Sequence, residues 1–196
     1  MLANRFTALI DACALFGVLT RNLLLSLAEA DLYRVRWSDQ ILDELERSLA
    51  EHFSKKGDVD AAEKAKQSRQ RMERAFPDAS VRGHEALIDS MRGLPDPDDR
   101  HVIAAAMKTQ ALVIVTENLR HFPAEALGQL DLEVKSADEF IADTMDLDIG
   151  RAVAAVREMR GRFQKPEMTA DDLLLKMDAQ GLTLSVDMLR EHVASL

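Results

Sequence analysis

The hydrophobic residues of this chain fall into two kinds of pattern, and the first predicts strands. Residues 6–10 are a short apolar run that predicts a strand, and residues 111–116 (ALVIVT) form an uninterrupted apolar run, typical of a strand that is buried on both faces of a parallel sheet. Residues 33–37 alternate between apolar and polar, as in a short extended segment, and residues 132–134 form a further candidate strand. Each run is bounded by polar or turn residues, so we expect separate short strands.

The second pattern places apolar residues at helical spacing between these strands. Ser38 can cap the helix that follows it, and Pro97 suits the first position of another. Thr169, with Asp172 three residues later and Gly181 beyond, marks a helix in the C-terminal part. Alternating strands and helices favour an α/β fold with a parallel sheet covered by helices on both faces. The helices are expected at residues 14–32, 40–53, 59–75, 85–91 and 97–109, and repeatedly from 137 onward.

Polar residues follow two of the predicted strands, at the edge where such sheets bind ligands. Asp11 ends the first strand, and Thr116–Asn118 end the ALVIVT strand. The turn and first helical turn before that strand contain Asp96, Asp98 and Asp99. Because the carboxyl ends of parallel strands meet at one edge, these positions can converge. Clustered carboxylates must hold protons or bind a cation, and oxygen ligands without His or Cys suit Mg²⁺ or Mn²⁺, so we expect a metal site.

The three aspartates of this turn have different expected roles. Asp99 shares a helical face with the apolar residues of the following turns, so its carboxylate points toward the core side, which is costly without a partner. Asp98 lies off that face and is a further candidate at the metal site, as a ligand or in support of the ligands, or else makes favourable contact with the helix dipole. Asp96 stands before Pro97 and is better placed as a helix cap.

Helical periodicity does not identify which further acid belongs to the expected metal site. The helix after Trp37 offers Asp43, Glu44 and Glu46, and its apolar positions do not choose among them. The formal net charge of −9 is concentrated after residue 120, which leaves the first part of the chain nearly neutral. Arginines there could meet phosphates, although each could equally be a solvated helix charge. The candidates for nucleic-acid contact are Arg34, Arg36, Arg47 and Arg100.

Four segments of the sequence together resemble a known family. ALIDACALF, ILDELERSL, LPDPDDRHVIAAA and VIVTENLRHFP are similar to the successive acidic motifs of PIN-domain nucleases, including VapC-type toxins. The resemblance covers roughly residues 6–145 and implies a three-layer α/β/α sandwich. It also implies metal-binding acids at Asp11, Glu44 and Asp99, with Asn118 in the fourth position and Thr116 as a supporting hydroxyl.

The sequence departs from the family pattern in two places. Cys13 stands where Asn, Ser or Thr is common, and we expect it to be only a small core residue. Asn118 stands where Asp is common, which makes the site less negative and predicts weaker metal binding. His121 occupies a position where an acid also occurs, and a surface or supporting role is preferred to a ligand role. The remaining histidines have no paired ligand spacing and are interpreted as ordinary residues: His52, His84, His101 and His192.

The resemblance implies a metal-dependent endoribonuclease that hydrolyses RNA phosphodiesters and leaves 5′-phosphates, as the toxin of a toxin–antitoxin pair. Two alternatives stay open. A PIN-like binding module that has lost turnover is compatible with Asn118. An aspartate-based phosphotransferase would use Asp11 as nucleophile, but Cys13 occupies the place where such enzymes usually carry a second Asp.

Composition indicates a globular chain with one core-bearing domain and an extension. It has 196 residues, of which 47% are hydrophobic and 30% charged. We expect a cytoplasmic protein without a membrane span, because no apolar run approaches the required length and one cysteine forms no internal disulfide. The expected partners are RNA, a cognate antitoxin and a second copy of the chain. We expect a nuclease domain at 1–147 and a helical extension at 148–196, which could dock back or bind a partner.

Overall fold

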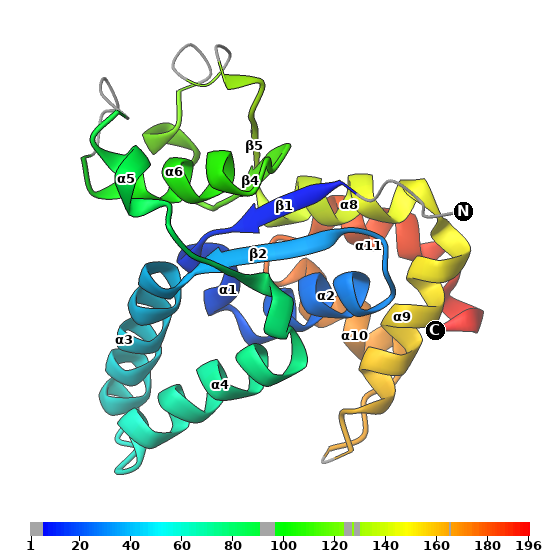
Figure 1. Ribbon diagram of the computed structural model, residues 1–196. Helices are drawn as coiled ribbons and strands as arrows, with labels where there is room; N and C mark the ends of the chain where they lie inside the picture. The colour runs from blue at the N-terminus through cyan, green and yellow to red at the C-terminus, as the bar shows by residue number, and fades with distance from the viewer. Residues whose placement is uncertain (1–5, 91–96, 124–126, 128–129, 165) are drawn as a thin grey trace.

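The sheet is parallel throughout and places the earliest strand at its centre. The computed structural model describes residues 6–90, 97–123, 127, 130–164 and 166–196. The strand order is β3-β2-β1-β4-β5, so the central β1 has β2 on one side and β4 on the other (Figure 1). The expected parallel α/β architecture is therefore confirmed. The strands are β1 (Thr7–Ile10), β2 (Arg34–Ser38), β3 (Ser80–Val81), β4 (Val113–Val115) and β5 (Glu133–Lys135).

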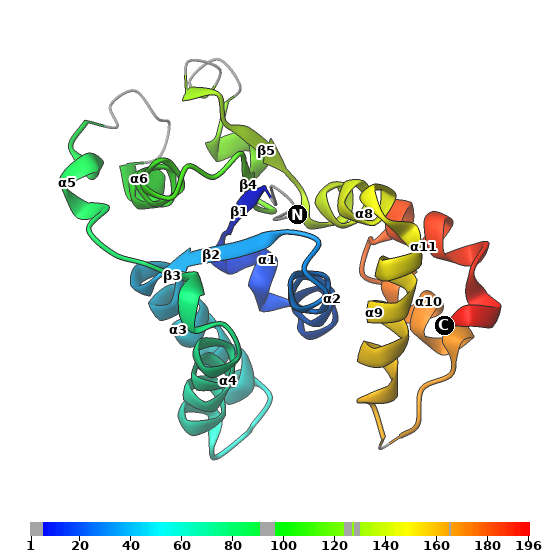
Figure 2. The same ribbon diagram turned by 45° about the vertical axis from the view of Figure 1, so that its right-hand side comes forward.

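Helices cover both faces of the sheet, as the three-layer expectation requires. α5 and α6 lie on one side, while α1, α2 and α3 lie on the other with α4 packed against α3 (Figure 2). The continuous apolar strands are thus buried on both faces, and Leu9 and Ile114 are fully inaccessible. The helices of this part are α1 (Ala12–Phe16), α2 (Val18–Glu29), α3 (Asp39–Lys55), α4 (Ala61–Ala75), α5 (Glu85–Ile88) and α6 (Arg100–Lys108).

Most expected elements are present, and their ends follow the signals in the sequence. Ser38 caps α3, since its hydroxyl accepts a hydrogen bond from the Ile41 N–H at 3.2 Å. Pro97 begins a 3₁₀ turn (Pro97–Asp99), and α6 follows at Arg100. Met91, the expected end of a short helix, and Asp96 lie outside the described residues.

One expectation about the elements was wrong, and one element was missed. The helix predicted at 14–32 is divided at Gly17, whose extended backbone separates α1 from α2. Arg21 compensates for the break, because its guanidinium donates to the carbonyl oxygens of Leu15 at 2.7 Å and Phe16 at 3.3 Å, at the end of α1. The edge strand β3 was not expected, since two residues are too short to show a hydrophobic period.

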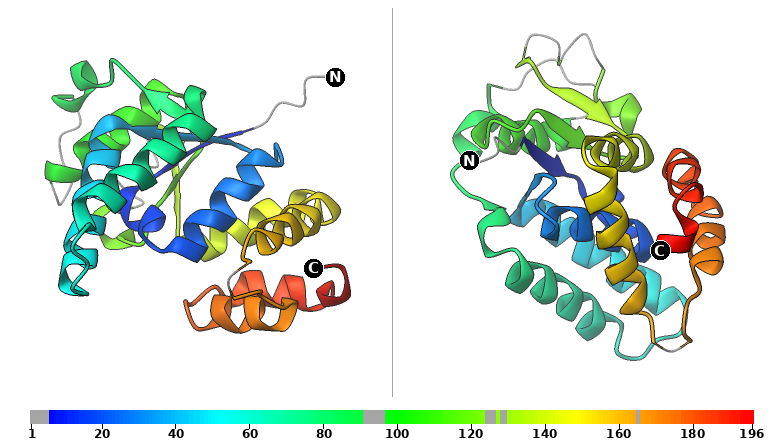
Figure 3. Two further views of the ribbon diagram at one scale, coloured as in Figure 1. Left: turned by 90° about the horizontal axis from the view of Figure 1, so that it is seen from below. Right: turned by 90° about the vertical axis from the view of Figure 1, so that its right-hand side faces the viewer.

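The C-terminal part consists of helices that dock on the sheet domain. α9 packs against α2, and α11 packs against α8 (Figure 3). The capping box at Thr169 and Asp172 forms as predicted. Within the described residues, none of the helices combines the length and the apolar character needed to cross a membrane. These helices are α8 (Ala137–Leu147), α9 (Ile149–Gly161), α10 (Ala170–Asp178) and α11 (Thr183–Arg190).

Candidate active site

Asp11 is held rigidly where β1 passes into α1. Its backbone N–H still bonds to the Val115 carbonyl at 2.9 Å, which extends the ladder between the two central strands. Its side chain is 5% exposed and caps α1, since Oδ1 accepts from the Ala12 N–H at 2.7 Å. Oδ2 accepts from the Thr116 hydroxyl at 2.7 Å. The carboxylate is therefore fixed by β1, α1 and the end of β4 at once.

Cys13 and Thr116 form a small polar network around that carboxylate. The Cys13 thiol donates to Asp11 Oδ2 at 3.1 Å, and its sulfur lies 3.1 Å from Thr116 Oγ1. The Thr116 oxygen in turn accepts from the Asn118 N–H at 3.1 Å, and the Glu117 N–H donates to the Cys13 sulfur at 3.2 Å. Burial, together with the nearby Asp11 charge, raises the pKa of the Cys13 thiol to about 12. Cys13 is thus a protonated donor within the site as well as a small packed residue.

Glu44 comes from α3 and meets a histidine of α6. The Nε2 atom of His101 lies 3.1 Å from Glu44 Oε1. His101 is only 3% exposed, whereas the Glu44 side chain keeps about a third of its surface open to the cavity. The neighbouring acids Asp43 and Glu46 bond instead to Arg69 on α4. The fold therefore distinguishes Glu44 from its two neighbours, which helical periodicity could not do.

Asp99 ends the 3₁₀ turn before α6 and also meets a histidine. His121 Nδ1, in the short turn after β4, lies 2.8 Å from Asp99 Oδ2. The Asp99 side chain is 17% exposed and lines the cavity described below, whereas Asp98 is exposed and does not line it. Asp99 thus contacts the short turn Leu119–His121 that follows β4.

One cavity of about 660 Å³ brings the four principal candidates together. Asp11 and Asn118 reach it from the strand ends, Glu44 from α3, and Asp99 from the turn before α6. Carboxylate and amide oxygens are the donors that a hard divalent cation prefers, so the donor chemistry fits Mg²⁺ or Mn²⁺. Among the described residues, no three His, Cys, Asp or Glu side chains are gathered closely enough to form a ready ligand set.

The candidate arginines occupy different places. Arg47 on α3 lines this cavity, together with Lys55 from the last turn of the same helix. Arg34 and Arg36 lie on β2 and line a different cavity, near the start of that strand. Arg100 opens α6 beside Asp99 and lines neither cavity.

Sequence reasoning missed two histidines. His101 was interpreted as ordinary because its partner Glu44 lies far away in the sequence, and only the packing of α6 beside α3 brings them together. His52 also lines the cavity, and its ring makes an edge contact with Phe16 at 5.3 Å between centroids. A signal was available for His101, since a polar residue interrupts the otherwise apolar face of α6.

Comparison with known proteins places this fold and site in a family. A model described as PIN domain matches residues 7–120, more than half of the chain, so the chain belongs to the PIN domain family. A model described as VapC50 C-terminal domain matches residues 137–191. The family inferred from the four motifs, PIN-domain proteins of the VapC type, is thereby confirmed.

The chain is also similar to a curated relative from Mycobacterium tuberculosis (strain ATCC 25618 / H37Rv), "Putative ribonuclease VapC50". The two are 40% identical over 92 residues, which are 47% of this chain and 53% of the relative. The match thus spans about half the length of that protein. No solved structure matches this chain.

Proposed function

We propose that this chain is a metal-dependent endoribonuclease of the toxin type. The observation that carries the proposal is the convergence of Asp11, Glu44, Asp99 and Asn118 on one cavity at the carboxyl edge of the sheet. Family membership and the ribonuclease name of the relative support the same activity. The cations of Arg47 and Lys55 on the cavity wall are suited to a polyanionic substrate.

The four oxygen-bearing side chains are the residues that would hold Mg²⁺ or Mn²⁺. When bound, such an ion supplies Lewis acidity toward a phosphate oxygen and lowers the pKa of a coordinated water. Asn118 contributes a neutral oxygen, so the site carries one negative charge fewer than a set of four carboxylates. We therefore expect weaker ion binding than in such a set.

The surrounding residues hold these ligands in place. Thr116 and Cys13 both donate to Asp11 Oδ2. The Asp11 carboxylate is therefore already oriented before an ion binds. His101 and His121 contact Glu44 and Asp99 in the same way. Arg47 and Lys55 bind the phosphates that flank the cleaved bond. Hydrolysis breaks the bond from phosphorus to the 3′-oxygen and joins a water oxygen to phosphorus, which leaves a 3′-hydroxyl and a 5′-phosphate.

Cleavage of single-stranded RNA by the purified chain tests this proposal directly. We expect cleavage with Mn²⁺ or Mg²⁺, none with EDTA, and products that carry 5′-phosphates. Asp11→Asn should abolish cleavage, because a neutral amide supplies less charge to a hard cation. Cys13→Ser is the matched variant and should cleave nearly normally, since a hydroxyl also donates to Asp11. RNA binding without cleavage under any metal would favour the binding-module alternative.

The biological role proposed here is that of a toxin restrained by an antitoxin. We expect production of the chain to arrest bacterial growth, and production of a cognate antitoxin from a neighbouring gene to relieve the arrest. We also expect a cytoplasmic location and a homodimer, which sedimentation would detect. Growth that is equally fast with the parent chain and with Asp11→Asn would contradict the toxin role without excluding RNA processing.

A further inference from the structure

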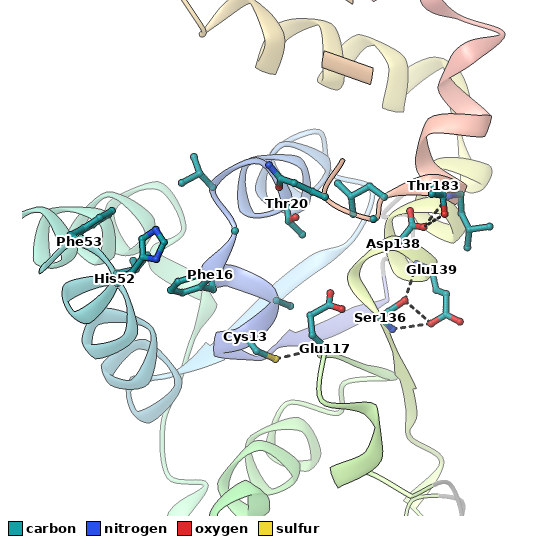
Figure 4. A pocket seen from close by; sticks show the side chains of 18 of the residues that line it. Cys13, Phe16, Thr20, His52, Phe53, Glu117, Ser136, Asp138, Glu139 and Thr183 are labelled. Atoms are coloured by element: carbon teal, nitrogen blue, oxygen red, sulfur yellow. Dashed lines mark hydrogen bonds between the residues drawn. The ribbon is translucent and has the colours of Figure 1, made fainter. Parts of the chain in front are cut away.

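A second, larger cavity adjoins the one that holds the candidate ligands. It has a volume of about 830 Å³ and lies between α1, α3, the start of α8 and the connection from α10 to α11 (Figure 4). The two cavities share Cys13, Phe16 and His52, which form the ridge between them. A strand of RNA whose phosphate lies among the candidate ligands can therefore place a neighbouring nucleotide in the second cavity.

One wall of this cavity is aromatic. The rings of Phe16 and His52 meet edge to face at 5.3 Å between centroids, and Phe53 adjoins His52 at 6.0 Å. Lys56, at the end of α3, lines the same side. All three rings are partly exposed, so their faces and edges remain available. Unpaired nucleobases stack on such rings, and this stacking tolerates any base.

The opposite wall offers carboxylates (Figure 4). Glu117 accepts the Ala137 N–H at 3.1 Å through Oε1, and its side chain stays exposed. Glu139 accepts from Ser136 in the capping box of α8. Ionised carboxylates only accept hydrogen bonds, so this wall favours groups with N–H donors.

The far wall comes from the C-terminal helices and is anchored at one residue. Asp138 accepts from the Leu184 N–H at 2.9 Å, and from the Ser185 N–H at 3.0 Å and hydroxyl at 2.7 Å. These bonds fix the start of α11 against α8. Residues 180–184, which lead from α10 into α11, are all uncharged, so the acidic group of this wall is Asp138.

We propose, on the basis of the function proposed above, that this second cavity binds the unpaired base next to the cleaved phosphate and selects against uracil. The base stacks on Phe16 and His52 and presents its edge to Glu117. Guanine, adenine and cytosine carry an exocyclic amino group that can donate to this carboxylate. Uracil offers a single N3–H donor between two carbonyl oxygens, and the acidic wall repels those oxygens. The backbone phosphates lie on the other side of the ridge, where Arg47 and Lys55 are found.

Binding measured in EDTA separates this inference from catalysis, because no hydrolysis takes place there. The probe is a fluorescent single-stranded oligoribonucleotide whose cleavage position has been mapped with metal. Versions carry guanosine, uridine or an abasic ribose on either side of that position. We expect uridine and the abasic ribose, on one of the two sides, each to weaken binding about tenfold relative to guanosine.

Two substitutions on opposite walls complete the experiment. His52→Ala should remove most of the difference between the guanosine and abasic probes, whereas His192→Ala, outside both cavities, should not change it. Glu117→Gln should bring guanosine and uridine to about equal affinity, because an amide can donate to a uracil carbonyl. Glu158→Gln is the exposed control, and thermal melts should show that all four variants remain folded.

The outcomes are distinguishable. If no oligoribonucleotide is cleaved with metal, no cleavage position can be mapped and the proposed function itself fails. If the parent binds RNA but the probes differ neither for the parent nor for the two wall variants, the base-binding cavity is wrong while the nuclease proposal stands. That result would leave the acidic wall free for a basic peptide, which would then compete with none of the probes.

Discussion

The imidazole of His101 lies 3.1 Å from the carboxylate of Glu44, one of the candidate ligands, and so links α6 to α3. The link is almost completely buried on the histidine side, and His101 Nδ1 makes no hydrogen bond within the described part of the chain. The contact thus joins a buried imidazole on α6 to a half-buried carboxylate on α3 and restricts where the Glu44 side chain can lie. His101 is therefore a positioning residue for Glu44.

Replacing His101 tests this role. His101→Ala should lower kcat for RNA cleavage and the Mn²⁺ affinity, each by about tenfold or more, because the ligand loses its orientation. His101→Gln should recover part of both, since its amide can still donate to Glu44. His84→Ala is the matched control, because His84 is equally buried but lines neither cavity. Equal Mn²⁺ titration curves for His101→Ala and His84→Ala would contradict the role.

The turn before α6 contains two adjacent aspartates, and their substitution should affect metal binding differently. Asp99→Asn should strongly reduce Mn²⁺ affinity and cleavage, because Asp99 lines the cavity. Asp98→Asn should change both only slightly, because Asp98 is exposed and does not line it. Calorimetric Mn²⁺ titration of the two variants makes the comparison, and a larger loss with Asp98→Asn would mean that the site is misplaced in this turn.

Arg69 joins α4 to α3 through several acids at once. Its guanidinium bonds to Asp43, lies 3.5 Å from Glu46 and 3.7 Å from Asp39, and bonds to Glu73 of its own helix at 2.9 Å. Arg69→Met should lower the free energy of unfolding by about 1–2 kcal/mol, because the acids then repel one another. The loss should shrink in 1 M NaCl, which screens that repulsion. A loss in Tm that is independent of salt would point to packing instead.

The buried Tyr33 should make the free energy of unfolding depend on pH in the alkaline range. It is 2% exposed, its hydroxyl donates to the Leu24 carbonyl at 3.0 Å, and burial raises its pKa above the usual range. The unfolded chain therefore loses this proton near pH 10 while the folded chain keeps it. Its contribution to stability is complete below that pH and falls by about 1.4 kcal/mol per unit above it.

This chain contains a single tyrosine, so tyrosinate absorbance reports on Tyr33 alone. The absorbance at 295 nm should stay low in the folded protein as the pH rises past 10, and should increase together with loss of helical circular dichroism. Ionisation near pH 10 with unchanged circular dichroism would show that Tyr33 is accessible.

The fold was largely predictable because its central strands are apolar on both faces. The run that became β4 has no polar residue to confuse its assignment, the run that became β1 has only Thr7, and Ser38 and Thr169 begin helices as expected. The break at Gly17 was not predictable, because the leucines keep their helical spacing across it. The hydrogen bonds of Arg21 to the end of α1, which stabilise the break, likewise leave no hydrophobic period.

Some residues of the candidate site could be predicted from the sequence pattern, and others could not. Asp11 and Asn118 could be placed from the strand ends alone, and the edge rule brought them together in advance. Glu44 could be chosen only through family resemblance, because the turns of α3 do not distinguish it from Asp43. The structure supplies the physical reason, since Asp43 bonds to Arg69 while Glu44 meets His101. Contacts between distant helices leave no local period in a sequence.

The hydrogen bond between Thr116 and Asp11 joins positions that are 105 residues apart. Closing so long a loop costs chain entropy before the contact returns any stability, so we expect β4 to join β1 after contacts between nearer segments have formed. While β4 is still inside the ribosome during translation, the nascent chain lacks the β1–β4 strand pair, and the side chain of Asp11 is not yet fixed by Thr116. The candidate active site is therefore complete only after most of the PIN domain has left the ribosome.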